Sequence, residues 1–213
     1  MSSITINPGD RLPVMLERID RARFERSTEA IAAVREDHDY ELRLSLKNRL
    51  IASPRAGGEV IEARMSTLRP DHVYTIVTAK RTLDCYRKVT RDGRLHRNGH
   101  HELELRESGT DRGRVFTFGN RGCVFTNKEP CQRLTVLRLD GQEYIQYQAD
   151  TGKSWLWANV YTVTLDSDGQ PVAIIVSAPS WLLSVRRMRV LGTPSPTLIG
   201  LMMAADHGFI FRS

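Results

Sequence analysis

The sequence predicts a mainly β protein: a closed antiparallel β-barrel around a buried hydrophobic C-terminal helix, with a short helical segment at the N-terminus. Three observations lead to this prediction. Short apolar segments with period-two alternation follow one another from residue 40 almost to the end of the chain. Turn signals separate them, as in barrels and sandwiches, where a parallel α/β sheet would need helices. Residues 198–205 would be apolar on every side of a helix, and a closed barrel buries such a helix most simply.

Length and composition agree with one globular unit. The chain has 213 residues, of which 26% are charged and 40% hydrophobic, so wholesale disorder and a polytopic membrane protein are both excluded. All-β barrels reach roughly 200 residues as a single unit. We therefore expect residues 1–38 to form a helical N-terminal extension and residues 39–213 to form the barrel with its helix.

Cysteine usage and the N-terminal residues indicate where the protein resides. The odd number of cysteines favours a reducing compartment with free thiols: Cys85, Cys123 and Cys131. No signal-peptide pattern opens the chain, and no apolar stretch approaches the roughly 18 residues of a transmembrane span. We expect a cytoplasmic protein without a transmembrane span, with peripheral membrane and nuclear locations as alternatives.

Helical spacing is confined to the first part of the chain and to its end. Between residues 27 and 37, Ser27 can cap a helix whose apolar side chains recur at helical spacing: Ala30, Ile31, Ala33 and Val34. Further helical turns after Pro13 are indicated by Met15, Leu16, Ile19 and Ala22. These helices either pack on the barrel or bind a protein partner.

The strands follow from residue 40. Apolar and polar residues alternate over 40–47, and further strands are predicted at 73–77, 103–105, 115–118, 124–125, 134–139 and 144–147. Three Asp-Gly dipeptides predict hairpin turns: Asp92-Gly93, Asp140-Gly141 and Asp168-Gly169. The last one joins strands at 160–165 and 172–176, and the second of these reads as substantially buried.

The C-terminal helix has recognisable ends. Ser195 is a suitable N-cap, and Pro196 occupies the first helical position. The apolar run follows from Leu198 to Ala205, and Gly208 supplies the stop.

Two segments carry a resemblance to a known family. YTVTLDSDGQPVAIIVSAPSWL, residues 161–182, combines a strand, an Asp-Gly turn, a second strand and an aromatic-bearing stretch. TLIGLMMAADHGFIF, residues 197–211, is an apolar helix with Asp206 near its end, followed by Phe209 and Phe211. Together these segments, which lie in the last quarter of the chain, resemble the tubby-like superfamily, which includes tubby C-terminal domains, phospholipid scramblases and LURP-one-related proteins. The calcium-site and cysteine-rich features of scramblases are not evident, so lipid translocation is not carried over.

The resemblance implies a fold and a function. It implies a twelve-stranded barrel that encloses the hydrophobic helix. It also implies a non-enzymatic lipid-binding protein, because tubby domains bind phosphoinositide headgroups with basic residues on the barrel surface. The expected partner is therefore an anionic lipid membrane surface.

Basic residues that could bind anionic headgroups form two groups along the chain. Clustered Lys and Arg raise the local potential and bind phosphates. The candidate ligands are Lys80, Arg81, Arg87, Lys88, Arg186, Arg187 and Arg189, and Arg91, Arg94 and Arg97 extend the first group. Three alternatives stay open: nucleic-acid binding by the same residues, a structural or partner-binding scaffold, and a merely solvated strand face.

Other chemistry has weaker support. His96, His100 and His101 form a histidine cluster, but only His96 and His100 have the spacing of zinc ligands. Cys123 is not surrounded by a nucleophile signature. Asp166-x-Asp168-Gly169 resembles the start of a calcium loop but lacks the remaining ligands. Trp155, Trp157 and Trp181 fit core packing, with base stacking or a membrane interface as the alternatives. We therefore expect no catalytic residue, no metal and no cofactor.

Overall fold

The structure, a computed structural model, describes residues 37–45, 48–66, 71–88, 101–118, 134–149, 160–177 and 186–207. These residues form twelve strands and one helix. The strands are β1 (Tyr40–Ser45), β2 (Arg49–Pro54), β3 (Ile61–Met65), β4 (His72–Val77), β5 (Thr82–Arg87), β6 (His101–Glu107), β7 (Thr110–Phe118), β8 (Leu134–Leu139), β9 (Gln142–Ala149), β10 (Val160–Asp166), β11 (Pro171–Ser177) and β12 (Arg186–Val190). The helix is α3 (Pro196–His207).

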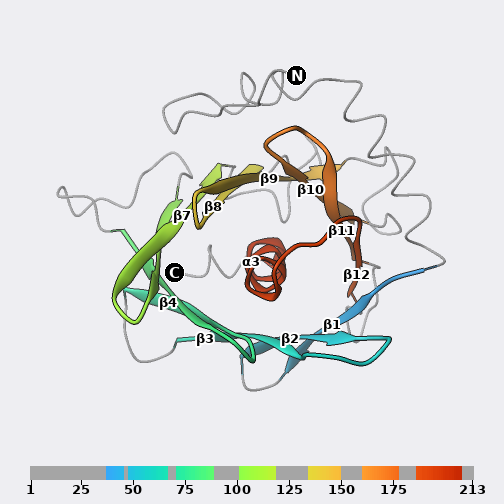
Figure 1. The fold of residues 1–213 in the computed structure, drawn as a ribbon, viewed down its shortest axis with the longest axis horizontal. Helices are drawn as coiled ribbons and strands as arrows, with labels where there is room; N and C mark the ends of the chain where they lie inside the picture. Colours follow the sequence, from blue (N-terminus) through green and yellow to red (C-terminus); the bar gives the residue numbers. More distant parts are fainter. Residues whose placement is uncertain are drawn as a thin grey trace, which may run out of the picture.

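The twelve strands form a closed antiparallel barrel (Figure 1). Each strand pairs with its neighbours in the sequence, and β12 closes the ring by pairing with β1, where Tyr40 lies opposite Met188. Closure removes the two edge strands that an open sheet would have. The prediction of a mainly β protein with a closed barrel is confirmed.

Hairpin turns connect the strands at one end of the barrel. Asp140 and Gly141 have φ angles of 50° and 81° between β8 and β9, as a two-residue turn of primed type requires. Asp168-Gly169 lies in the turn between β10 and β11. Both predicted Asp-Gly turns are therefore confirmed. The third, Asp92-Gly93, lies outside the described residues.

Four strands had no individual prediction: β2, β3, β5 and β12. β2 and β3 each bury two apolar side chains toward α3: Leu50 and Ala52 from β2, and Ile61 and Ala63 from β3. Alanine has little intrinsic preference for a strand, so packing against the helix decides these elements. The predicted N-terminal helices and the predicted strand at 124–125 lie outside the described residues.

The helix α3 runs through the middle of the barrel (Figure 1). The side chains of residues 198–205 are at most 3% exposed, and the Ser195 hydroxyl accepts a hydrogen bond from the Leu198 N–H at 3.2 Å. The predicted cap and the predicted burial are confirmed. Across the described residues, no helix has both the length and the apolar character that a membrane crossing requires.

The number of strands explains why one helix fits. Twelve strands spaced about 4.8 Å apart, at typical barrel tilts, close at a radius of about 12 Å. A helix with its side chains has a radius of about 5–6 Å, and inward-facing wall side chains add about 5 Å. The helix and the wall therefore fill the interior, which is why every face of α3 must be apolar.

Gly200 marks the closest approach of α3 to the wall. A Cβ atom there would lie 2.5 Å from Cγ2 of Ile76 and 3.2 Å from Cγ2 of Ile61. We expect Gly200→Ala to destabilise the fold by about 1–3 kcal/mol in urea denaturation, because overpacking a dense core outweighs the better helix propensity of alanine. Gly192→Ala is the matched control, since a Cβ there meets nothing within 4 Å. Equal stability of both variants would contradict close packing at this point.

Candidate functional site

The two groups of basic residues lie on different parts of the barrel. β5 and β12 are separated in the ring by β4, β3, β2 and β1. Within the first group, Lys80 and Arg81 precede β5, whereas Arg87 and Lys88 lie at its other end. The seven candidate headgroup ligands therefore do not converge on one surface.

Two members of the first group, Arg81 and Lys88, are bound to carboxylates. The Arg81 guanidinium donates to Glu107 at 3.0 Å and to both carboxylate oxygens of Asp140, and it holds the pKa of Asp140 below its ordinary value. Arg81 thus connects three neighbouring hairpins. Lys88 lies 2.9 Å from Glu102 on the adjacent strand β6. Lys80 and Arg87 have no ion pair among the described residues.

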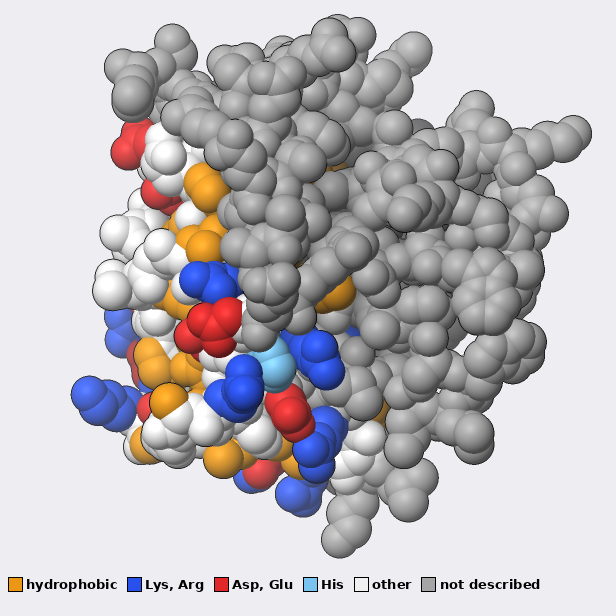
Figure 2. All heavy atoms as spheres, turned by 90° about the vertical axis from the view of Figure 1, so that its right-hand side faces the viewer, with side chains coloured by type: hydrophobic (Ala, Val, Ile, Leu, Met, Phe, Trp, Pro, Cys, Tyr) orange, Lys and Arg blue, Asp and Glu red, His pale blue; other side chains and the backbone are white. Residues whose placement is uncertain are grey.

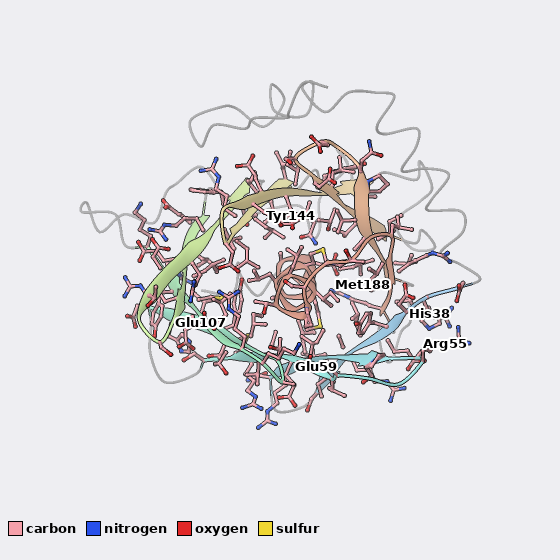
Figure 3. All side chains as sticks on the ribbon, viewed as in Figure 1. His38, Arg55, Glu59, Glu107, Tyr144 and Met188 are labelled. Carbon is pink, nitrogen blue, oxygen red and sulfur yellow. The ribbon has the colours of Figure 1, made fainter. Side chains whose placement is uncertain are left out.

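In the second group, neighbouring residues point in opposite directions. Alternation along β12 directs Arg186 and Met188 toward α3, and Arg187 and Arg189 toward the outside. Figure 3 shows Met188 on the inner side of the wall. Because successive side chains of a strand face opposite sides, a cluster in the sequence is divided between the two faces of the sheet.

Arg186 is an internal residue, which corrects its grouping with the outward-facing ligands. Its guanidinium lies 2.7 Å from Oδ2 of Asp206, whose side chain is 3% exposed. The Thr162 hydroxyl donates to the other oxygen of Asp206. The carboxylate sits in the last turn of α3, where the helix dipole disfavours negative charge, and Arg186 offsets this cost.

A pocket of about 630 Å³ lies at the end of the barrel where β12 leads into α3. Arg55 lines this pocket, and Arg189 is linked to it through its ion pair with Asp37. Residues 37–40, the β2–β3 turn at 54–57 and the connection from β12 to α3 line it, with Ile199 from the helix itself. Figure 2 shows basic and acidic side chains gathered around a histidine on this side of the molecule, and Figure 3 places His38 and Arg55 close together there.

His38 is the unusual side chain of this pocket. Both of its ring nitrogens are buried, and neither has a hydrogen-bond partner. Burial lowers the pKa of His38, and the positive charges of Arg187 and Arg55 lower it further, against the opposing effect of Glu41 and Asp37. His38 is therefore held neutral by its surroundings and keeps two unused hydrogen-bonding positions.

Carboxylates balance part of the positive charge. The Asp37 carboxylate lies 3.3 Å from the Arg189 guanidinium and 3.9 Å from that of Arg55. The Asp39 carboxylate accepts the backbone N–H of Val190 at 2.7 Å, which fixes the start of β1 against β12. Arg187 is exposed and has no ion pair among the described residues. The pocket thus offers the guanidinium of Arg55 together with carboxylate acceptors.

The sequence alone did not indicate His38 or Arg55. Neither lies in a motif, and the segments that bring them together are separated by the hairpin of β1 and β2. Only Arg187 and Arg189 were identified from the sequence. The basic run at residues 186–189 was the available signal, and strand pairing supplied the rest.

The remaining chemical candidates receive structural roles where they are described. Asp166 accepts the N–H groups of Asp168 and Gln170, so it stabilises the hairpin turn. Burial raises the pKa of Cys85 well above its ordinary value, which keeps this thiol protonated beside Tyr74. Within the described ranges, no three His, Cys, Asp or Glu side chains are placed to hold a metal ion. His96, His100, Cys123, Trp155, Trp157 and Trp181 lie outside them, and of His101 only the backbone, at the start of β6, is described.

Comparisons of the chain with protein-family models, curated proteins and solved structures find no match. The function must therefore be inferred from the barrel, the pocket and the residues that line it.

The pair of Arg186 and Asp206 gives a stability prediction. Asp206→Ala leaves a largely buried guanidinium without its carboxylate, and we expect a loss of about 3 kcal/mol in the free energy of unfolding. Replacing both partners, with Asp206→Leu and Arg186→Met, should recover most of this loss. Asp168→Ala in the exposed β10–β11 turn is the control and should change stability by less than about 1 kcal/mol. An Asp206→Ala protein as stable as the parent would contradict the role given to this pair.

His38 gives a pH prediction. Because its pKa is lower in the folded protein than in the unfolded chain, the unfolded chain binds the proton more readily, and stability falls as the pH drops through 6.5. We expect His38→Gln to lose less stability than the parent between pH 7.5 and pH 5, measured by urea denaturation at both values. An unchanged pH dependence would show that another group is responsible.

Proposed function

We propose that this protein is a non-enzymatic binding protein of the tubby-like type, and that it binds the anionic headgroups of phosphoinositides at a cytoplasmic membrane surface. The observation that carries the proposal is the pocket at the start of α3. There Arg55 lines the pocket beside a histidine whose two ring nitrogens have no hydrogen-bond partner, and the positive charge of the outward-facing Arg187 acts on the same histidine.

The architecture supports the family part of the proposal. A closed barrel of twelve strands around an apolar C-terminal helix agrees with the fold that the resemblance of residues 161–182 and 197–211 implies. The pocket is formed by strand ends, a hairpin turn and the helix start, which are rigid elements. Rigid walls are suited to holding a headgroup in one orientation.

The chemistry of the pocket supports an inositol phosphate as the ligand. Its phosphates accept charge-assisted hydrogen bonds from guanidinium groups, and its ring hydroxyls can donate to Asp37. The volume of about 630 Å³ lies within the usual range for small-molecule sites. Three carboxylates share this region of the surface, Asp37, Asp39 and Glu41, and they repel the phosphates of a headgroup and of a nucleic acid alike. The liposome and oligonucleotide measurements therefore decide between these two ligands.

The same geometry favours binding over catalysis. A general base needs a partner that orients its ring, as in nucleophile, histidine and carboxylate arrangements. Neither ring nitrogen of His38 has such a partner. His38 thus lacks the orienting partner that a general base requires.

Liposome sedimentation tests the proposal. We expect the protein to bind vesicles that contain phosphoinositides and to leave pure phosphatidylcholine vesicles unbound. Arg187→Glu combined with Arg55→Glu should weaken binding at least about tenfold, since one charge-assisted hydrogen bond contributes about 1.5–3 kcal/mol. The control is the double variant Arg43→Glu and Arg64→Glu, which changes net charge equally at exposed positions of β1 and β3.

Equal binding to both kinds of vesicle would overturn the proposal, as would equal weakening by both double variants. Oligonucleotide binding that falls steeply with salt and is lost in the Arg187 and Arg55 variant would assign the site to nucleic acid. Binding to neither would leave a scaffold role.

A further inference from the structure

The outside of the barrel has two unlike walls. Along β1 to β6, charged side chains face outward and pair along the same strand, as in Arg43 with Glu41, Arg64 with Glu62 and Arg106 with Glu104. Along β8 to β11, most of the described outward side chains are apolar, and Arg138 pairs with Glu143 near the β8–β9 turn. We call these nine residues the apolar wall: Leu134, Val136, Ile145, Tyr147, Val163, Leu165, Val172, Ile174 and Val176.

The strand pairing shows that the apolar wall faces away from α3. Val136 lies opposite Ile145, and Val163 lies opposite both Tyr147 and Ile174. The alternate residues of the same strands face inward, where Gln146 donates to the Met202 carbonyl and Thr162 donates to Asp206. The wall is therefore a second apolar surface, separate from the core around the helix.

Every side chain of the apolar wall is at most 9% exposed. The described part of the chain consists of the strands, their turns and the central helix, and none of these lies outside β8 to β11. Nine such side chains left open to water would form an apolar patch larger than monomeric proteins normally tolerate. Something must therefore cover the wall from outside.

We propose that the N-terminal segment, residues 1–36, packs over the apolar wall as an intrachain cover. The segment joins the described chain at Asp37, immediately before β1, and only β12 separates β1 from β11 in the ring. From β11 to β8 the wall is about 14 Å wide, which a helix of ten residues, about 15 Å long, can span. Two apolar stripes at helical spacing lie in the segment, at residues 15–22 and 30–34.

Chain length argues against two of the loops as the cover. Leu165 and Val172 lie next to the β10–β11 turn, at the end of the barrel where Asp37 enters β1. The segments at 150–159 and 178–185 leave from the opposite end. They can reach at most about 17 and 14 Å before they must return, whereas a strand of seven residues is about 23 Å long. Residues 119–133 connect β7 to β8, so they are attached at the edge of the wall that is farthest from β1.

Photocrosslinking in the full-length protein tests the proposal. The probe p-benzoylphenylalanine replaces Ile31, which lies on the apolar stripe, or Glu36, which lies on the opposite side of the same predicted helix. After irradiation, mass spectrometry locates the adducts. We expect intrachain adducts from position 31 to peptides of β8 to β11, and at least fivefold fewer from position 36.

Adducts from position 31 that map mainly to other parts of the chain would overturn the proposal. Adducts between two chains, seen as a dimer on a denaturing gel, would also overturn it and would assign the wall to a second copy. A second measurement uses bis-ANS, a dye that fluoresces on apolar surfaces. Ile31→Asp should raise its fluorescence severalfold and Glu36→Gln should leave it unchanged, whereas equal fluorescence of both variants would contradict a cover formed by this segment.

Discussion

The burial of α3 inside a closed barrel is the constraint on which the rest of the structure depends. A helix surrounded by a wall has no access to water, so each polar group on it needs a partner from the strands. The Met202 carbonyl accepts a hydrogen bond from the Gln146 amide at 3.0 Å. The Asp206 carboxylate accepts hydrogen bonds from Arg186 and Thr162. These contacts come from β9, β10 and β12. The polar residues of the barrel interior are thus placed where the helix requires them.

The same constraint determines where a ligand can reach the protein. Because helix and wall fill the interior, the barrel provides a binding site only at its surface or at its ends. The end where β12 turns into α3 is hollowed, and strand ends and the β2–β3 turn bring His38 and Arg55 to it. The positive charge of Arg187, on the outer side of β12, acts on His38, while the preceding residue, Arg186, is committed to the helix. Arg186 and Arg187 are neighbours in β12 but face opposite sides of the sheet, so the first has a structural role and the second has the proposed binding role.

The outside of the barrel is organised by a different requirement. Strands β1 to β6 present charges and are compatible with water, whereas β8 to β11 bury side chains on both faces. Continuous apolar runs such as residues 172–176 reflect this double burial, since alternation is expected only where one face is wet. The apolar runs in β8 and β11 therefore indicate, already in the sequence, strands that are buried on both faces.

Periodicity within the sequence determined the fold class, the C-terminal helix with its cap, most of the strands and two of the hairpin turns. These features depend on residues that are close in the chain, such as Ser195 with Leu198 and Asp140 with Gly141. Tertiary structure alone decided the partners of the charges. Arg81 meets Asp140 across 59 residues, and Arg186 meets Asp206 across 20. A basic residue is visible in a sequence, but whether it is free to bind a ligand depends on the strand register and on the face from which it projects.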